Sequence, residues 1–295
     1  MAVTEKRWKV PELVAWTAGY LGEKGFHNPR LNAELLLSAA LGLKRLDLYL
    51  QHDRPLDAGE LAGFKARLLR RAKREPLQYI EGRAAFRHLL LGVDPRVLIP
   101  RPETELLVQA VLDWAAGREG LSVLDVGTGS GAVALALATE GRFARVVATD
   151  VSAGALEVAA RNRDAAGAEV RVDFRLGSLY APVRGERFDV VVSNPPYVGD
   201  EERDGLDAEV REWEPGEALF AGSGGLDVIA PLVAGAPEQL EPGGLLALEI
   251  GAAQGAAVAG MVRETGCFAE PAVRRDLAGR DRMVLAELKP QDGVE

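Results

Sequence analysis

Cysteine and histidine are scarce in this sequence. Its 295 residues include one cysteine, Cys267, so the chain cannot form an internal disulfide, which is typical of proteins from a reducing compartment. A lone thiol of this kind usually lies in the core, and we expect that of Cys267 to be buried. Only three histidines accompany it. The residues therefore do not favour zinc, and we expect no metal site.

Long apolar runs are also lacking. The most apolar long window, residues 243–262, contains Glu249, Gln254 and several glycines, which indicates a strand, a turn and a helix rather than a membrane span. Residues 1–10 are charged and lack the apolar segment of a signal peptide. We therefore expect a cytoplasmic protein that has no membrane partner.

Charge of the two signs is unevenly distributed. Residues 1–100 carry 17 Lys and Arg against 11 Asp and Glu, a net charge of +6, whereas residues 101–295 carry 18 against 33, a net charge of −15. This asymmetry, with a length suited to about two domains, predicts two modules with different partners.

The front of the chain, residues 1–80, predicts a small all-α domain. Helices are expected to begin at Val10 with Pro11 in the first turn, at Pro29 with Asn28 as the cap, and at Leu56. Residues 65–74 are strongly basic, and we interpret them as a solvated helix end in preference to a nucleic-acid patch. A helical bundle in front of a catalytic module suggests a domain that recognises a partner.

A connector and a second domain are expected to follow. Residues 81–103 predict a linker with short strands at 85–91 and 93–99, before a helix that starts at Pro102 or Thr104. Within residues 104–295, strands and helices then alternate, which indicates an α/β doubly wound parallel sheet. We expect strands at 121–126, 146–150, 170–176, 187–193 and 245–250, helices at 132–140, 155–166, 224–240 and 252–264, and a closing antiparallel hairpin at 270–275 and 282–288.

A glycine-rich turn after the first of these strands predicts a nucleotide cradle. Its sequence is Gly127-Thr128-Gly129-Ser130-Gly131, and Asp150 ends the next strand, where it can bind two ribose hydroxyls. These features fit both a dinucleotide enzyme and an adenosyl-binding one. The G-x-G-x-G spacing and a sheet domain without histidine favour the second.

A rigid corner follows the strand at 187–193. The run Asn194-Pro195-Pro196-Tyr197 cannot continue a ladder, because neither proline has an N–H, and it lies where open α/β sheets bind ligands. An amide oxygen, a prolyl carbonyl and an aromatic ring together can hold a planar –C(=O)NH2 group. Alone, this run is equally well an ordinary turn. Beside a cradle for a methyl donor it has an evident use, whereas a hydride donor would give it none.

These motifs, with Ile99-Pro100-Arg101-Pro102-Glu103-Thr104-Glu105, Glu75-Pro76 and Glu214-Pro215, resemble the HemK/PrmC family over nearly the whole chain. That family consists of Rossmann-like class I methyltransferases that use S-adenosylmethionine, with S-adenosylhomocysteine as product, to methylate the glutamine N5 nitrogen in the Gly-Gly-Gln loop of class I peptide chain release factors. The partner implied is thus a release factor, with no direct nucleic acid required, and we expect a monomer.

The resemblance also implies roles for particular residues. It implies that the cofactor is bound by Gly127, Thr128, Gly129, Ser130, Gly131, Asp150, Leu179 and Asn194. It implies that the substrate is bound by Asn194, Pro195, Pro196 and Tyr197, of which Asn194, Pro195 and Tyr197 are catalytic. It also implies a lid formed by Arg101, Glu103 and Thr104. Three alternatives stay open: a ribosomal-protein glutamine methyltransferase, an amino-methyltransferase acting on DNA or RNA bases, and a non-catalytic adenosyl-binding module. The net charge of −15 in the sheet domain disfavours a polyanionic substrate.

Overall fold

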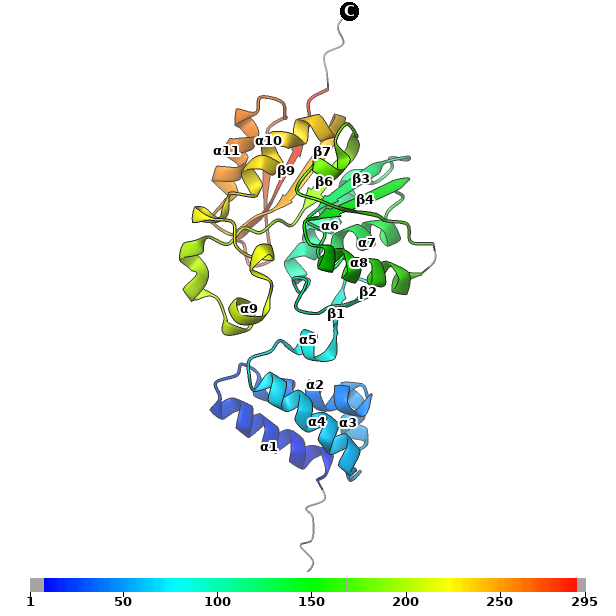
Figure 1. Cartoon of the computed structure of the whole chain (residues 1–295), viewed down its shortest axis with the longest axis vertical. Helices are drawn as coiled ribbons and strands as arrows, with labels where there is room; N and C mark the ends of the chain where they lie inside the picture. The colour runs from blue at the N-terminus through cyan, green and yellow to red at the C-terminus, as the bar shows by residue number, and fades with distance from the viewer. Residues whose placement is uncertain (1–7, 168, 291–295) are drawn as a thin grey trace, which may run out of the picture. The chain divides into compact units, whose positions relative to one another are not determined.

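The computed structural model describes residues 8–167 and 169–290, and the chain divides into two compact units (Figure 1). The first unit comprises residues 1–82 together with 208–213, and the second comprises residues 83–207 and 214–295. The segment 208–213 thus belongs to the first unit although it is far from it in sequence. Most of the stretch 1–10, which lacks a signal-peptide pattern, lies outside the described residues.

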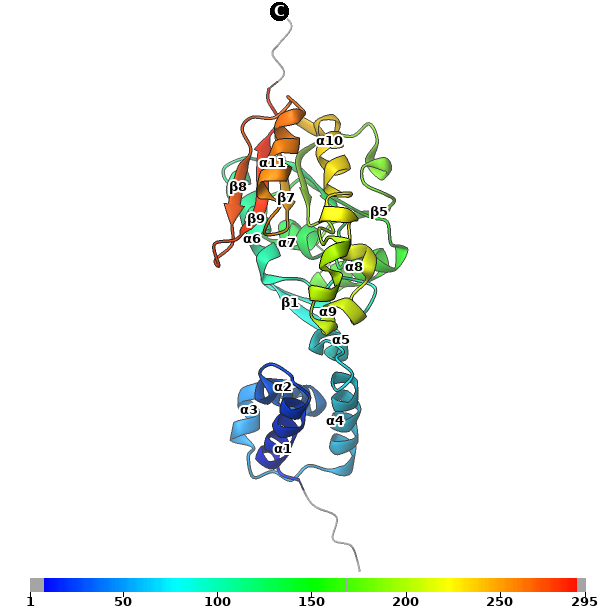
Figure 2. The same ribbon diagram turned by 90° about the vertical axis from the view of Figure 1, so that its left-hand side faces the viewer.

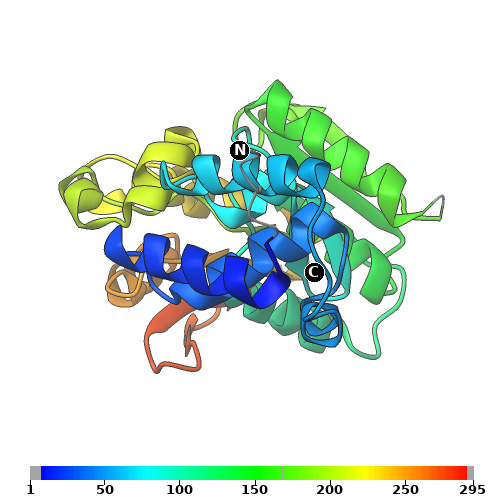
Figure 3. The same cartoon turned by 90° about the horizontal axis from the view of Figure 1, so that it is seen from below.

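The first unit is built from short helices (Figures 2 and 3, where α1 to α5 run from blue to cyan). Leu21, Leu36, Leu37 and Phe64 are part of its core. The predicted helices near residues 10, 29 and 56 are present. Three helices of five or six residues, α3, α5 and α9, were not predicted, because so short a segment shows little periodicity. The helices of this unit are α1 (Val10–Glu23), α2 (Pro29–Leu41), α3 (Arg45–Leu50), α4 (Ala58–Arg71), α5 (Leu77–Glu81) and α9 (Ala208–Trp213).

Two predicted helix starts need correction. Helix α4 begins at Ala58 rather than Leu56, because Asp57 Oδ1 accepts a hydrogen bond from the Glu60 N–H at 2.8 Å and so caps the helix. Asn28 does precede α2, but its backbone is left-handed, with φ of 49°, and its side chain forms no capping hydrogen bond.

The basic segment 65–74 is only partly a solvated face. Arg71 is buried, and its guanidinium donates to Asn32 Oδ1 at 2.7 Å, to the Glu75 carbonyl at 2.8 Å and to Glu209 Oε1 at 2.7 Å. Glu209 lies on α9, so this arginine joins segments that are 138 residues apart within one unit. The solvated interpretation is wrong for Arg71, whose charge was read as exposed because the sequence gives no sign of the distant carboxylate.

A small antiparallel hairpin opens the second unit. It pairs β1 (Arg83–Phe86) with β2 (Leu89–Gly92), a shift from the predicted strands at 85–91 and 93–99. Arg87 occupies the turn with φ of 51°, and its N–H donates to Glu105 Oε1 at 2.9 Å. The stretch 93–101 forms no strand, since Pro95 and Pro100 lack the N–H that a ladder requires.

The main sheet has seven strands in the order β5-β4-β3-β6-β7-β9-β8. The five strands from β5 to β7 run parallel, whereas β9 pairs antiparallel with both β7 and β8. This arrangement confirms the expected Rossmann-like α/β fold with a closing antiparallel hairpin, after a small helical region. The strands are β3 (Ser122–Val126), β4 (Arg145–Asp150), β5 (Asp173–Leu176), β6 (Phe188–Ser193), β7 (Leu240–Glu249), β8 (Ala272–Arg275) and β9 (Asp281–Glu287).

Helices cover both faces of this sheet (Figures 1 and 2). Successive strand residues point to opposite faces, so in β6 the side chains of Val190 and Val192 join one apolar cluster and that of Val191 joins the other. The first cluster includes residues of α6 (Pro102–Ala115) and α7 (Ala132–Glu140), and α8 (Ala153–Ala166) lies beside α7. The second cluster includes residues of α10 (Ile229–Gln239) and α11 (Gly255–Glu264).

Of three further predictions, the one for window 243–262 is confirmed, and those for the start of α10 and for the burial of Cys267 are wrong. Helix α10 begins at Ile229 rather than near 224, because Gly222, Gly224 and Gly225 have φ of 69°, 71° and 69°, outside the helical range. Window 243–262 forms the end of β7, a turn and most of α11, as predicted, and among the described residues no helix combines the length and apolarity of a membrane span. Cys267 is exposed rather than buried, since it lies in the turn after α11.

Candidate active site

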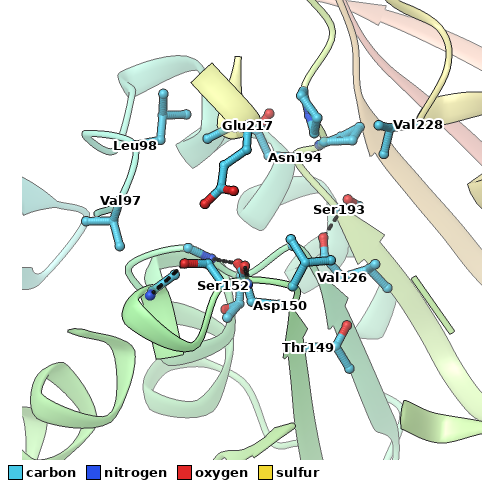
Figure 4. Close-up of a pocket in the computed structure, with 18 of the residues that line it drawn as sticks. Val97, Leu98, Val126, Thr149, Asp150, Ser152, Ser193, Asn194, Glu217 and Val228 are labelled. Atoms are coloured by element: carbon cyan, nitrogen blue, oxygen red, sulfur yellow. Dashed lines mark hydrogen bonds between the residues drawn. The ribbon is translucent and has the colours of Figure 1, made fainter. Parts of the chain in front are cut away.

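The carboxyl ends of β3, β4 and β6 surround a cavity of about 340 Å³ in the second unit (Figure 4). In a parallel sheet a crevice opens at the carboxyl ends of two neighbouring strands whose following connections run in opposite directions. Here the strand order reverses between β3 and β6, so the crevice lies at their ends. The cavity is lined by residues from the glycine loop, the ends of β4 and β6, the loop after β5 and the irregular segment before α6.

The glycines of the loop have different environments. Gly127 and Gly129 have φ of 74° and 56° and line the cavity, and a Cβ atom added to either would meet no atom within 4 Å. That open space is what a ligand lying against the backbone needs. Gly131 has φ of 83° but is not among the lining residues; a Cβ there would lie 3.1 Å from Leu135 Cδ1 and 3.2 Å from Ala159 Cβ. Its place is therefore in helix packing.

Asp150 closes the other side of the loop. Its Oδ2 accepts the Gly129 N–H at 2.8 Å and its Oδ1 accepts the Ser152 N–H at 2.9 Å (Figure 4). Burial raises the pKa of this carboxyl, and the two backbone donors oppose that rise. Because each carboxylate oxygen has a second lone pair, Asp150 can still accept from the hydroxyls of a ligand in the cavity.

Sequence reasoning missed Asp125, which lies beneath the loop. It is 1% exposed, and its Oδ2 accepts from Thr128 Oγ1 at 2.6 Å and from the Ala134 N–H at 3.1 Å. Burial raises the pKa of Asp125 to about 7. Thr128 lines the cavity, but its hydroxyl is engaged with this carboxyl. An acid within the apolar strand 121–126 was the available signal.

The corner after β6 brings Asn194, Pro195 and Pro196 to the cavity. Ser193 Oγ donates to the Val126 carbonyl at 2.6 Å, which ties the end of β6 to β3. Ser130 and Leu179 also line the cavity.

A chain of polar contacts starts at the Asn194 side chain. Its Nδ2 donates to Thr104 Oγ1 at 3.0 Å, and Thr104 Oγ1 donates to Glu249 Oε2 at 2.7 Å. Tyr197 is not among the lining residues, and its hydroxyl donates to Glu249 Oε1 at 3.3 Å. The hydroxyl end of this ring is thus bonded to a buried carboxylate, and the expected contact of the ring with a substrate amide stays a prediction.

The three residues expected to form a lid have separate positions. The Arg101 guanidinium pairs with Glu214, whose Oε2 also accepts the Ile99 N–H at 3.2 Å. Arg101 and Glu103 are not among the lining residues. Thr104 lines the cavity but is 4% exposed in the first turn of α6, so it cannot move as part of a lid without breaking the contacts described above.

Further lining residues were not predicted. Glu217 projects its carboxylate into the cavity (Figure 4), and Arg96, Val97, Leu98, Asp227 and Val228 also line it. They come from irregular segments before α6 and between β6 and α10, where no sequence period marks them.

The fold and this site define a methyltransferase with a Rossmann-like sheet. Residues 102–209 match the family model described as methyltransferase small domain, and residues 12–82 match the PrmC N-terminal domain. The fold is shared with a crystal structure titled methyltransferase from Pyrococcus furiosus, with a TM-score of 0.52 and 21% identity, covering 77% of this chain and 98% of that one.

Curated relatives identify the family within that class. A release factor glutamine methyltransferase of Geobacter sulfurreducens is 47% identical over 284 residues, which cover 96% of this chain and 98% of that protein. Another from Chlorobaculum tepidum is 43% identical over 287 residues, covering 94% and 97%. The chain belongs to the release factor glutamine methyltransferase family.

Proposed function

We propose that this protein transfers a methyl group from S-adenosylmethionine to the side-chain amide nitrogen of the glutamine in the Gly-Gly-Gln motif of class I peptide chain release factors. The observation that carries the proposal is the position of Asn194 and Pro195 at the cavity edge, opposite a glycine loop and a carboxylate suited to an adenosyl group. On this proposal the protein acts in the cytoplasm, where release factors work.

The cofactor fits the residues that line the cavity. Asp150 is placed to accept hydrogen bonds from both ribose hydroxyls, and the open backbone at Gly127 and Gly129 admits the methionine part at close range. When bound there, S-adenosylmethionine would supply an electrophilic methyl group on a positively charged sulfur. Leu179 supplies an apolar side chain for the adenine.

The charge of the cavity supports a cationic cofactor over a dinucleotide. Three carboxylates line it, those of Asp150, Glu217 and Asp227, whereas Arg96 is the one cation among the lining residues that the structure describes. Arg96 is also neutralised, because it pairs with Asp94 and Glu157. A pyrophosphate would be repelled by this set, and a sulfonium would be attracted.

The chemical difficulty is that an amide nitrogen is a weak nucleophile, since its lone pair is delocalised into the carbonyl. Asn194 Oδ1 forms no hydrogen bond with the described residues and so is available as an acceptor. With the Pro195 carbonyl it can hold the two hydrogens of a substrate –NH2 and fix the direction of the nitrogen. The partial negative charge on the two carbonyl oxygens stabilises the positive charge that develops on nitrogen. Because both acceptors are neutral and weakly basic, the proton leaves after methyl transfer.

Recognition of the release factor falls to the first unit on this proposal. On α3 the side chains of Leu46 and Leu50 are 70% and 73% exposed, and the half-exposed Tyr49 lies beside them. Because residues three and four apart share a helix face, these side chains form one apolar surface. Exposed apolar groups of this kind are typical of a surface that binds another protein.

Transfer of a labelled methyl group is the direct test. The protein should label a full-length class I release factor and fail to label the same factor with the motif glutamine changed to glutamate, which has no amide nitrogen. Ribosomal protein, DNA and RNA serve as competing substrates. Equal labelling of both forms of the release factor, or preferential labelling of any competitor, would contradict the proposal.

A further inference from the structure

A polar relay runs from the wall of the cavity to a buried carboxylate and joins three elements of the second unit. Asn194 follows β6, Thr104 lies in the first turn of α6, and Glu249 ends β7. Asn194 Nδ2 lies 3.0 Å from Thr104 Oγ1, which lies 2.7 Å from Glu249 Oε2. Thr104 is 4% exposed and Glu249 is 1% exposed, so water cannot substitute for either partner.

The relay has a direction that follows from the number of hydrogens in it. An ionised carboxylate accepts hydrogen bonds and donates none, so Thr104 must give its one hydroxyl hydrogen to Glu249. The Thr104 oxygen can then only accept from its other neighbour. Asn194 must therefore turn its NH2 toward Thr104, which leaves its carbonyl oxygen for the cavity.

We propose that Thr104 and Glu249 are positioning residues that set the orientation of the Asn194 amide, an inference that rests on the proposed role of Asn194 as the acceptor for the substrate amide. The two ends of an asparagine amide have nearly the same shape, so packing alone does not select between them. Only a hydrogen-bond partner of fixed polarity does. A reversed amide would present a donor to the donor of the substrate, and the nitrogen would lose its alignment.

The surroundings of Glu249 decide the pH range in which the relay keeps this direction. Tyr197 donates to its other oxygen, Oε1, at 3.3 Å, so both carboxylate oxygens are occupied by hydroxyl donors. The charged groups that face it are Arg282 on β9, which favours its ionised form, and Glu103 on α6, which opposes it. Burial outweighs these contacts and raises the pKa of Glu249 to about 7. A protonated Glu249 could donate to Thr104 and so permit the reversed relay.

The first test compares two variants of Thr104 acting on a full-length class I release factor. Thr104→Val keeps the shape and removes the hydroxyl; kcat should fall roughly 100-fold, because a misaligned nitrogen loses near-attack geometry. Thr104→Ser restores the hydroxyl and should recover most of that loss. The dissociation constant for S-adenosylmethionine should change little in either variant. The melting temperature should fall in Thr104→Val, because Glu249 Oε2 loses its buried donor, and should recover in Thr104→Ser, so kcat is compared per folded protein. Parent-like kcat in Thr104→Val, or no recovery in Thr104→Ser, would overturn the inference.

A double-variant experiment separates orientation from packing. In Asn194→Asp both side-chain oxygens are acceptors, so orientation no longer matters. Adding Thr104→Val to that background should change kcat less than about threefold, against the roughly 100-fold loss expected with Asn194 present. Equal losses in the two backgrounds would show that Thr104 only supports packing.

Glu249→Gln tests the polarity of the relay. Glutamine can donate to Thr104, so kcat should fall. The parent's kcat should decline as the pH falls through about 7 and Glu249 takes up a proton, and this decline should be absent in Glu249→Gln. A decline of the same size in Glu249→Gln would refute the assignment. Failure of this inference can be told apart from failure of the proposed function. If Asn194→Ala is inactive and Thr104→Val is fully active, only the positioning role of Thr104 is refuted. If Asn194→Ala is active, the proposed role of Asn194 as the substrate acceptor is itself refuted.

Discussion

Replacement of Asp150 by alanine should weaken the binding of S-adenosylmethionine roughly 30- to 140-fold. The estimate rests on two hydrogen bonds from ribose hydroxyls to a charged acceptor, together worth about 2–3 kcal/mol, with each 1.4 kcal/mol equal to a factor of ten. Asp150 also accepts the N–H groups of Gly129 and Ser152, at 2.8 and 2.9 Å, so its loss frees both donors in the loop.

Asp150→Asn is the matched control for this experiment. Asparagine keeps one acceptor oxygen of the same shape, so it should bind the cofactor more weakly than the parent and more tightly than Asp150→Ala. Stability should change little in either variant, because burial already disfavours the carboxylate, as the direction of its pKa shows, and this offsets the lost backbone contacts. Titration calorimetry measures the affinities and thermal melts measure the stability. An unchanged affinity in Asp150→Ala, or tight binding of NAD by the parent, would refute the reasoning.

Three further predictions follow from the site and the helical unit. Asn194→Ala should lower kcat roughly 100-fold or more with a smaller effect on cofactor affinity, and Asn194→Asp should retain activity between that of the alanine variant and the parent; parent-like turnover in the alanine variant would mean that the corner is only a turn. Leu46→Ser combined with Leu50→Ser should raise KM for the release factor and leave cofactor affinity unchanged, because both side chains are exposed on α3 and support no core. A parent-like KM in steady-state kinetics would show that these side chains do not bind the release factor. The pKa of Asp125 is raised from 3.8 to about 7, so this carboxyl keeps its proton to a higher pH in the folded state than in the unfolded state, and the free energy of unfolding should fall by up to about 4 kcal/mol as the pH rises from about 4 to about 7. Denaturant unfolding of Asp125→Asn should show a smaller fall over the same range, and a fall of equal size would contradict this assignment.

Periodicity and composition were sufficient to predict the sheet and its helices. The strand at 187–193 is β6 to within one residue. The glycine loop after β3 and Asp150 at the end of β4 lie together at the carboxyl edge of the sheet, as expected. Such features are local: apolar runs, prolines and glycines act on the backbone within a few residues of their own position.

The remainder depends on partners that are distant in sequence. The resemblance implied a lid that includes Thr104, yet the hydroxyl of this residue reaches Glu249, 145 residues away. The contact of Tyr197 with the substrate stays a prediction, but the bond from its hydroxyl to the buried carboxylate of Glu249 was not foreseen. No spacing within one segment reveals a hydrogen bond of this kind, since it depends on where the folded sheet places two strand ends.

The short helix α9 has a consequence for dividing or recombining this protein. It lies in the connection between β6 and β7, yet its residues 208–213 belong to the helical unit, with Glu209 bound to Arg71 and the Trp213 indole N–H donating to the Lys73 carbonyl at 3.2 Å. The helical unit, to which we assign release-factor recognition in our proposal, is therefore discontinuous. A cut near residue 83 would strand α9 without its partners, and a chimaera that exchanged only residues 1–82 with those of a relative would pair one protein's Arg71 with another's α9. Exchanges of substrate specificity should carry both segments together.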